Sequence, residues 1–218
     1  MGNRIYPIGI QNFEKIRKEG YVYVDKTALM YKLVKSGSYF FLSRPRRFGK
    51  SLLISTLEAY FEAKRDLFEG LAVETLEKDW VKRPVLHLDL NIGKYDTPDS
   101  LDKILNETLD YWESLYGTRS AETTLALRFA GVVGRAYEQS GERVAILIDE
   151  YDKPLLQAIG NEELQREFRN TLKPFYGVLK TMDGCIKFAL LTGVTKFGKV
   201  SVFSDLNNLN DISMDEPF

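Results

Sequence analysis

The feature of this sequence that most constrains its fold is a passage from an apolar strand to an apolar helix through a short basic loop. Residues 40–42 are apolar and aromatic, as in a buried strand, and the chain then breaks at a proline and a run of arginines. After Gly49-Lys50-Ser51, apolar residues recur over residues 52–61 with helical spacing. A strand, a loop that carries Gly-Lys-Ser and a helix, in that order, form the context in which such a loop binds phosphate.

The beginning of the expected helix is suited to an anion for local physical reasons. Its first amides have no partners within the helix, and the helix dipole adds partial positive charge at the same place. Gly49 would let the backbone approach phosphates, Lys50 would reach the β and γ oxygens, and the hydroxyl of Ser51 would ligate Mg²⁺. The residues that we expect to hold the phosphates are Arg44, Pro45, Arg46, Arg47, Phe48, Gly49, Lys50, Ser51 and Leu52.

The match to the phosphate-binding pattern is nevertheless incomplete. The pattern has a first glycine five positions before the second, and Arg44 occupies that position here. A bare Gly-Lys-Ser also occurs by chance in chains of ordinary composition, so a plain solvated basic loop is the alternative. A second element of the sequence has to decide between the two.

That second element is an apolar run that ends in two acids. Residues 144–148 are apolar and mostly β-branched, which predicts a buried strand of a parallel sheet, and Asp149-Glu150 follow directly. In open α/β sheets the ligand lies outside the carboxyl ends of the strands. We therefore predict that Asp149 holds Mg²⁺ and that Glu150 orients and polarises the attacking water. The alternative is an acidic turn after a core strand.

Motifs spread over nearly the whole chain carry a family resemblance. They are residues 23–27 (YVDKT), 44–51 (RPRRFGKS), 148–152 (IDEYD), 191–197 (LTGVTKF) and 206–209 (LNNL). In these motifs the sequence resembles the AAA-ATPase-like family of prokaryotic P-loop proteins. The resemblance implies that Arg44 in place of glycine is a family trait. It also implies that full-length members often carry a C-terminal nuclease-like domain of the restriction-endonuclease type, of which these residues show nothing.

Charge and composition exclude some classes of protein. The 218 residues carry 30 basic and 31 acidic side chains, so there is no global electrostatic case for nucleic acid, although a local basic patch stays open. The single cysteine, Cys185, excludes an internal disulfide framework and suits a reducing cytoplasm. No apolar run approaches the roughly 20 residues of a membrane helix, and the N-terminus lacks a signal pattern. We expect a soluble, cytoplasmic protein with no membrane partner.

Strands alternating with amphipathic helices predict an α/β fold: a three-layer P-loop NTPase core with a mostly parallel sheet. Strands are expected near residues 39, 85, 144 and 186. The resemblance implies an AAA-like strand order, in which the strand before the basic loop lies beside the strand near residue 186. The expected helices are residues 12–19, 28–35, 101–116, 123–139 and 161–180, besides the helix after the basic loop.

The expected organisation has three parts. Residues 1–35 form an N-terminal segment that flanks the nucleotide site, residues 36–200 form the core, and residues 201–218 begin a truncated C-terminal region. From Lys196 onward the chain is expected to be loop-like. Pro174 is expected to bend or interrupt the helix in which it lies.

A polar residue at the end of the strand near residue 186 would face the nucleotide beside the two acids. Thr192 is our candidate for a sensor that touches the γ-phosphate or the attacking water, and Thr195 is the second candidate. The alternative is a threonine at a strand end whose hydroxyl is satisfied by backbone.

Further predictions concern packing. Phe13 or Ile8 would pack on adenine or else belong to the core. His87 is the single histidine and has no cysteine near it, so we expect a satisfied core residue and no metal role. Within residues 64–82 we expect a core side formed by Phe68, Leu71, Leu76 and Trp80.

The resulting interpretation is an ATP-binding, Mg²⁺-dependent NTPase that hydrolyses the β–γ bond, with Lys50, Glu150 and Thr192 catalytic and with Ser51 and Asp149 on the metal. The alternative is a nucleotide-gated interaction or regulatory module with little turnover that controls an attached nuclease-like domain. A small-molecule phosphotransferase is disfavoured because adjacent acids suit water activation.

Three questions about partners stay open at this stage. The loop arginines would assist Lys50 in cis, face solvent, or contact a nucleic-acid phosphate; they are Arg44, Arg46 and Arg47. Nucleic acid would be reached through the further C-terminal domain. Assembly into a homo-oligomer is left open.

Overall fold

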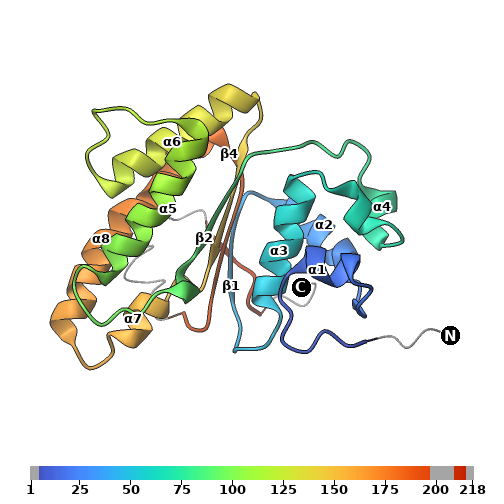
Figure 1. The fold of residues 1–218 in the computed structure, drawn as a ribbon, viewed down its shortest axis with the longest axis horizontal. Helices are drawn as coiled ribbons and strands as arrows, with labels where there is room; N and C mark the ends of the chain where they lie inside the picture. The colour runs from blue at the N-terminus through green and yellow to red at the C-terminus, as the bar shows by residue number, and fades with distance from the viewer. Residues whose placement is uncertain (1–4, 197–208, 215–218) are drawn as a thin grey trace.

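A computed structural model describes residues 5–196 and 209–214 of the chain. Its centre is one parallel sheet with the strand order β2-β3-β4-β1-β5 (Figure 1). The strands are β1 (Tyr39–Ser43), β2 (Val85–Asp89), β3 (Val144–Asp149), β4 (Ile186–Gly193) and β5 (Asn210–Asp211). The order places the strand before the basic loop beside β4, as the resemblance implied.

Helices cover both faces of the sheet and make the three expected layers (Figure 1). On one face lie α1 (Phe13–Lys18), α2 (Thr27–Ser36), α3 (Lys50–Phe61) and α4 (Ala72–Leu76). On the other lie α5 (Ser100–Tyr116), α6 (Leu125–Ser140), α7 (Lys153–Gln157) and α8 (Glu162–Thr181). Short 3₁₀ turns occupy η1 (Arg65–Phe68), η2 (Leu90–Ile92) and η3 (Asp183–Cys185). Among the described residues, no helix combines the length and apolar character needed to cross a bilayer.

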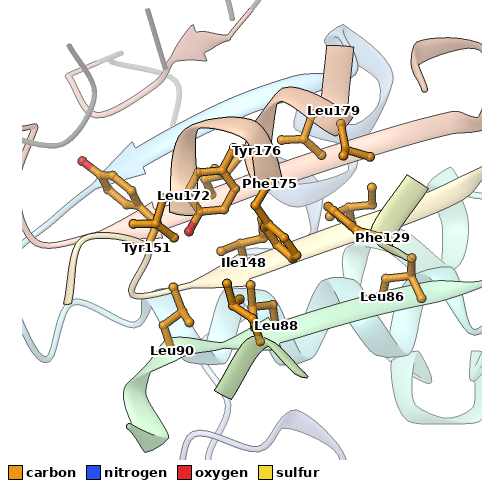
Figure 2. Packing of buried hydrophobic residues seen from close by; sticks show 14 of the residues in the cluster. Leu86, Leu88, Leu90, Phe129, Ile148, Tyr151, Leu172, Phe175, Tyr176 and Leu179 are labelled. Atoms are coloured by element: carbon orange, nitrogen blue, oxygen red, sulfur yellow. The ribbon is translucent and has the colours of Figure 1, made fainter. Parts of the chain in front are cut away.

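The apolar pattern of β3 explains why this strand lies inside the sheet. All six of its residues are buried, and they alternate between the two layers. Ala145 and Leu147 face the cluster under α3, whereas Ile146 and Ile148 face the cluster under α5, α6 and α8. Figure 2 shows that second cluster, in which the side chains of α6 and α8 pack on the strands. Burying each such side chain contributes about 1.5–3 kcal/mol.

Strand β5 was not expected, because we predicted a loop from Lys196 onward. The prediction is wrong at Asn210–Asp211, which pair with Phe40 and Phe41 of β1 in parallel. Two residues are too few to show the alternation that identifies a strand in a sequence. This strand is recognised only by its pairing with β1 in the structure. The motif at residues 206–209 lies mostly outside the described residues, as does most of the expected C-terminal region.

The prediction for Leu76 is wrong, and so is the alternative that Pro174 interrupts its helix. Leu76 is 41% exposed because α4 is only five residues long and buries Val73 instead. Helix α8 continues through Pro174, so the helix is not interrupted there. Buried residues on both sides of the proline, such as Phe168 and Leu179, hold the helix on the sheet. Their packing offsets the helix-interior cost of proline, about 3 kcal/mol.

His87 lies on β2, at the edge of the sheet formed by the described strands, and is half-buried rather than a core residue. Its Nδ1 is 3.4 Å from Oε2 of Glu58, while its buried Nε2 has no hydrogen-bond partner. Burial lowers the pKa of His87, but Glu58 and the more distant Asp89 and Asp149 outweigh burial and raise it overall. The expectation of a satisfied core histidine is therefore wrong, because an edge strand leaves alternate residues half-covered.

Candidate active site at the strand ends

The basic loop has the backbone that a close turn into a helix requires. It leaves β1 at residue 44 and enters α3 at Lys50, with left-handed φ angles of +69° at Arg47 and +79° at Gly49. Glycine adopts that conformation without steric cost, which explains its presence directly before the helix. No side chain caps α3 at this end. The residue before the helix is Gly49, which has no side chain that could accept the first amides of α3.

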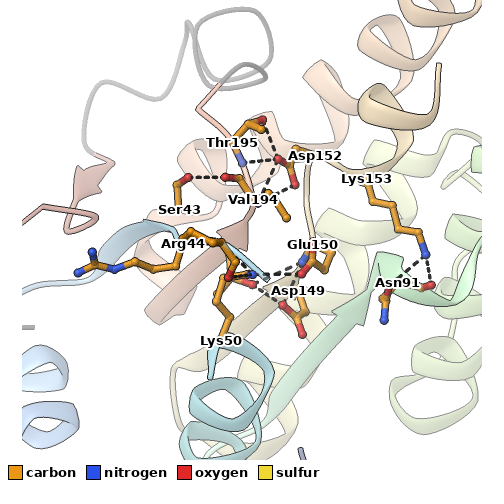
Figure 3. A network of polar contacts seen from close by, with 12 residues as sticks. Ser43, Arg44, Lys50, Asn91, Asp149, Glu150, Asp152, Lys153, Val194 and Thr195 are labelled. Atoms are coloured by element: carbon orange, nitrogen blue, oxygen red, sulfur yellow. Dashed lines mark hydrogen bonds and ion pairs between the residues drawn. The ribbon is translucent and has the colours of Figure 1, made fainter. Parts of the chain in front are cut away.

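Lys50 points back across the loop and is almost fully buried, with 5% of its surface exposed. Its Nζ donates to the backbone oxygens of Arg44 and Pro45, at 3.1 and 3.4 Å. It also lies 3.3 Å from Oε1 of Glu150 (Figure 3). The ammonium group is thus surrounded by oxygen atoms of the loop and one carboxylate, and phosphate oxygens are the same kind of partner.

The two predicted acids and Thr192 meet at the carboxyl ends of β3 and β4. The hydroxyl of Thr192 donates to Oδ1 of Asp149, which also accepts the amide of Glu150 at 3.1 Å. Asp149 is 4% exposed, and Thr192 is fully buried. The threonine hydroxyl therefore donates to a carboxylate, and it also accepts the backbone amide of Glu150 at 3.5 Å, so the backbone contact that the alternative expected is present as well.

Glu150 has an unusual backbone and an unusual acidity. Its φ of +54° is left-handed, a conformation that costs a non-glycine residue about 1–2 kcal/mol. Burial raises the pKa of its carboxyl; Lys50 opposes the change, and Asp149 and Asp152 add to it, so the pKa lies above its ordinary value of 4.5. A carboxylate with a raised pKa is a better proton acceptor at neutral pH.

The loop arginines differ in how far they reach solvent. Arg46 and Arg47 are exposed, whereas Arg44 is half-buried at the start of the loop. Phe48, between them and the helix, is 68% exposed. Pro45 is exposed, and Leu52 packs partly against the cluster under α3. Of the predicted loop residues, the structure therefore brings Lys50 to the acids and leaves the tip of the loop on the surface.

The two candidates for an adenine wall have different fates. Phe13 is fully buried, with its ring 5.1 Å from that of Tyr23 and 4.9 Å from that of Phe68, measured between centroids. Its core alternative is the one that the structure supports. Ile8 is 93% exposed and does not belong to the core. A wall for a base at Ile8 stays a prediction.

The predicted metal ligands offer the donor chemistry that Mg²⁺ prefers. Ser51 lies in the first turn of α3, and Asp149 ends β3, so a hydroxyl and a carboxylate flank the loop. Mg²⁺ is commonly held by one or two protein oxygens together with phosphates and water. Within the described residues there is no cluster of three or more metal-ligating His, Cys, Asp or Glu side chains.

Sequence reasoning missed two residues of this site. Asp152 is 1% exposed and accepts hydrogen bonds from Val194 and Thr195, directly after β4. Ser43, the last residue of β1, donates through Oγ to the oxygen of Val194 at 3.1 Å. The available signal was the position of Asp152 directly after Asp149-Glu150-Tyr151, because a third acid so close to a buried strand needs donors.

A large hollow on the described surface lies elsewhere. It has a volume of about 500 Å³, sits beside the start of β2, and is lined by residues that include Glu58, Arg83, His87, Tyr111 and Leu115. Several of its charged groups already have partners, such as Arg83 with Glu142. We take the strand ends as the candidate active site because reactive groups converge there, and the volume of a hollow alone does not supply such groups.

The sequence is similar to known proteins over most of its length. The sequence model of a family described as "Predicted AAA-ATPase" matches residues 7–203. A protein of Azotobacter chroococcum mcd 1, described as "Uncharacterized protein in vnfD 5'region", is 43% identical over 220 residues. That alignment covers 100% of this chain and 42% of the relative, so the chain spans about two fifths of the relative's length. The match over most of its residues establishes that the chain belongs to the predicted AAA-ATPase family.

Proposed function

We propose that this chain binds ATP together with Mg²⁺ and hydrolyses the bond between the β- and γ-phosphates, with water as the nucleophile. The observation that carries the proposal is the meeting of buried Lys50 with the Asp149-Glu150 pair across two strand ends. Membership of a family described as predicted ATPases supports nucleotide binding and hydrolysis in general. The residues, the metal and the bond cleaved are our proposal.

Each side chain has a separate role in this mechanism. Lys50 and the first amides of α3 bind the β- and γ-phosphates and stabilise the charge that develops on them. Ser51 and Asp149 hold Mg²⁺, which supplies positive charge at the phosphate oxygens when bound. Glu150 orients the attacking water and accepts its proton, and Thr192 positions that water or the γ-phosphate.

The ion pair between Lys50 and Glu150 supports an exchange of partners on binding. Phosphate oxygens are stronger partners for the ammonium than the neutral loop carbonyls that it contacts, at 3.1 and 3.4 Å. When they attract Lys50, the carboxylate of Glu150 loses its cation and becomes available to water. Binding of the nucleotide thereby makes Glu150 available as the base, because Lys50 cannot pair with the phosphates and with Glu150 in the same way at once.

The test of this function begins with Lys50→Ala. The variant loses a buried charge-assisted contact, which costs about 2–3 kcal/mol, or a 30- to 150-fold weaker affinity for a fluorescent ATP analogue. Lys35→Ala is the matched control, because Lys35 also pairs with a carboxylate, that of Glu77, at 3.1 Å. Equal affinity of the wild type and Lys50→Ala would contradict the proposed function.

A nucleotide-gated module with little turnover is the second candidate. It is favoured by the exposed tip of the loop, where Arg46, Arg47 and Phe48 are available to a partner beside the nucleotide. Nucleic acid reached through a nuclease-like domain, or a second copy of the chain, would be such a partner. Single-turnover hydrolysis measured with and without DNA separates the candidates. An enzyme hydrolyses ATP without a partner, whereas a nucleotide-gated module hydrolyses little and changes mainly its affinity for the partner when ATP binds.

A further inference from the structure

The carboxylate of Asp152 forms an unusually dense set of hydrogen bonds. It follows β3 and is 1% exposed. Oδ1 and Oδ2 accept the amide of Val194 at 3.2 and 3.1 Å, and Oδ2 also accepts the amide and hydroxyl of Thr195 at 2.7 and 2.8 Å (Figure 3). Every one of these donors belongs to the residues that directly follow β4. One buried acid thus fixes the backbone beyond Thr192.

The segment that Asp152 holds also contacts the beginning of the basic loop. The amide of Arg44 donates to the oxygen of Gly193 at 3.1 Å. The hydroxyl of Ser43 donates to the oxygen of Val194, also at 3.1 Å. The backbone oxygen of Val194 therefore accepts a hydrogen bond from the end of β1, and the amide of the same residue donates to Asp152. A displacement of Asp152 would therefore shift both the residues that follow β4 and the start of the basic loop.

Tyr151 strengthens the same attachment. Its amide donates to the oxygen of Thr192 at 2.9 Å, and its hydroxyl donates to the oxygen of Thr195 at 2.8 Å. The approach is so close that a Cβ at Gly193 would lie 2.5 Å from Tyr151 Cε1 and 2.7 Å from Asp152 Oδ1. Only glycine fits between them, so the segment has little freedom to shift.

We propose that Asp152 is a positioning residue: it holds residues 193–195 so that Thr192 stays on Asp149 and the basic loop stays aligned with Glu150. The inference rests on the proposed function, because it assigns a purpose to the alignment of those groups. Asp152 itself faces backbone and one hydroxyl, and it acts on the reaction through the segment it holds. Small displacements of reacting groups are costly, since about 1 Å can lower a rate 10²-fold.

The decisive variant is Asp152→Asn, with Glu77→Gln as its matched control. The side-chain amide introduced by Asp152→Asn would keep the size of the side chain but present a donor where a carboxylate now accepts two amides and a hydroxyl. Glu77 is comparable, because it is 6% exposed and accepts the amides of Lys78 and Asp79 and the hydroxyl of Tyr60. Glu77 lies between α4 and β2, away from the strand ends. Its replacement therefore tests how lost stability alone affects the hydrolysis rate.

Three quantities are measured for each protein: the melting temperature, the affinity for fluorescent ADP and ATP analogues, and the single-turnover rate of hydrolysis. For Asp152→Asn we expect ADP affinity within about threefold of the wild type, a lower preference for ATP over ADP, and hydrolysis at least about 10-fold slower. For Glu77→Gln we expect a lower melting temperature and a hydrolysis rate within about twofold of the wild type.

The outcomes that would overturn the inference are distinct. If Asp152→Asn hydrolyses ATP at the wild-type rate and prefers ATP over ADP as the wild type does, this inference is overturned and the proposed function is not affected. A loss of rate that tracks the melting temperature equally in both variants would also overturn it. A wild type that binds neither nucleotide would remove the proposed function and this inference with it. If Asp152→Asn does not fold, Asp152→Glu keeps the charge but displaces the carboxylate from the amides of Val194 and Thr195, and a wild-type rate and ATP preference in that variant would overturn the inference.

Discussion

Lys50 and Glu150 come from opposite halves of the sequence, yet Nζ of one lies 3.3 Å from Oε1 of the other. Their side chains are 4% and 16% exposed, so the pair is largely shielded from water. Both residues belong to motifs that the sequence alone made recognisable, and their contact joins the basic loop to the end of β3. The predictions below concern this junction and the groups that maintain it.

Glu150→Gln separates binding from chemistry. The amide keeps the shape of the side chain but cannot polarise water, so turnover should fall by a factor of about 10² or more, the scale of a lost general base. Binding of a fluorescent ATP analogue should be unchanged or tighter, because Lys50 loses a competing anion. The control is Glu142→Gln, which removes the partner of Arg83 far from the site. Turnover equal to the wild type would make Glu150 a simple strand-end acid.

Thr192→Val tests the hydroxyl that donates to Asp149. The change is nearly isosteric and leaves a buried carboxylate oxygen with one donor fewer, which costs about 1–3 kcal/mol in the free energy of unfolding. We expect hydrolysis to fall at least about 10-fold, because Asp149 loses the contact that orients it. Urea unfolding and single-turnover hydrolysis are measured together. Thr171→Val, which removes a hydroxyl bonded to Asp102 away from the strand ends, is the control.

The raised pKa of Glu150 predicts a pH dependence of stability. The unfolded chain titrates this group near 4.5, and burial raises the pKa in the folded protein despite the opposing effect of Lys50. A raised folded pKa gives a stabilising contribution that is complete below the unfolded value and is lost as pH rises through the folded value. The wild type should therefore lose stability relative to Glu150→Gln as pH rises from about 4.5. Urea unfolding of both proteins over that range measures it, and a constant difference would contradict the prediction.

Glu77 should act in the opposite direction at acid pH. Burial alone would raise its pKa, but Tyr60, the amide of Asp79 and Lys35 together lower it from 4.5 to about 2. A lowered folded pKa gives stability that is present above the unfolded value and is lost as pH falls towards the folded one. Wild-type stability should thus decline between about pH 4.5 and 2 more steeply than that of Glu77→Gln. Acid unfolding followed by circular dichroism tests this, and parallel curves would refute it.

The loop arginines should divide by their exposure. Arg46 and Arg47 reach solvent, so Ala at either position should leave single-turnover hydrolysis by the isolated chain within about threefold. Arg44 is half-buried at the start of the loop, and Arg44→Ala should slow hydrolysis more than either. If Arg46→Ala or Arg47→Ala slowed hydrolysis by decades, the arginine would act on the phosphates in cis.

Much of the fold and of the junction could be predicted because the decisive signals are local. A buried apolar strand that ends in two adjacent acids, as at Asp149-Glu150, can be recognised within a dozen residues. The parallel arrangement then forces such strand ends to one edge of the sheet. Asp152 could not be assigned in that way, since its partners Val194 and Thr195 follow another strand and are mainly backbone groups. Backbone donors carry no sequence signature.

The strained backbone of Glu150 has a consequence for attempts to improve this protein. Its φ of +54° is one that glycine adopts freely, so Glu150→Gly should melt at a higher temperature than Glu150→Ala. Among small residues at this position, a search for thermostable variants without a functional screen would therefore favour glycine, which removes the acid to which we assign the activation of water. Under the proposed function, selection for backbone freedom and selection for turnover would favour different residues at position 150.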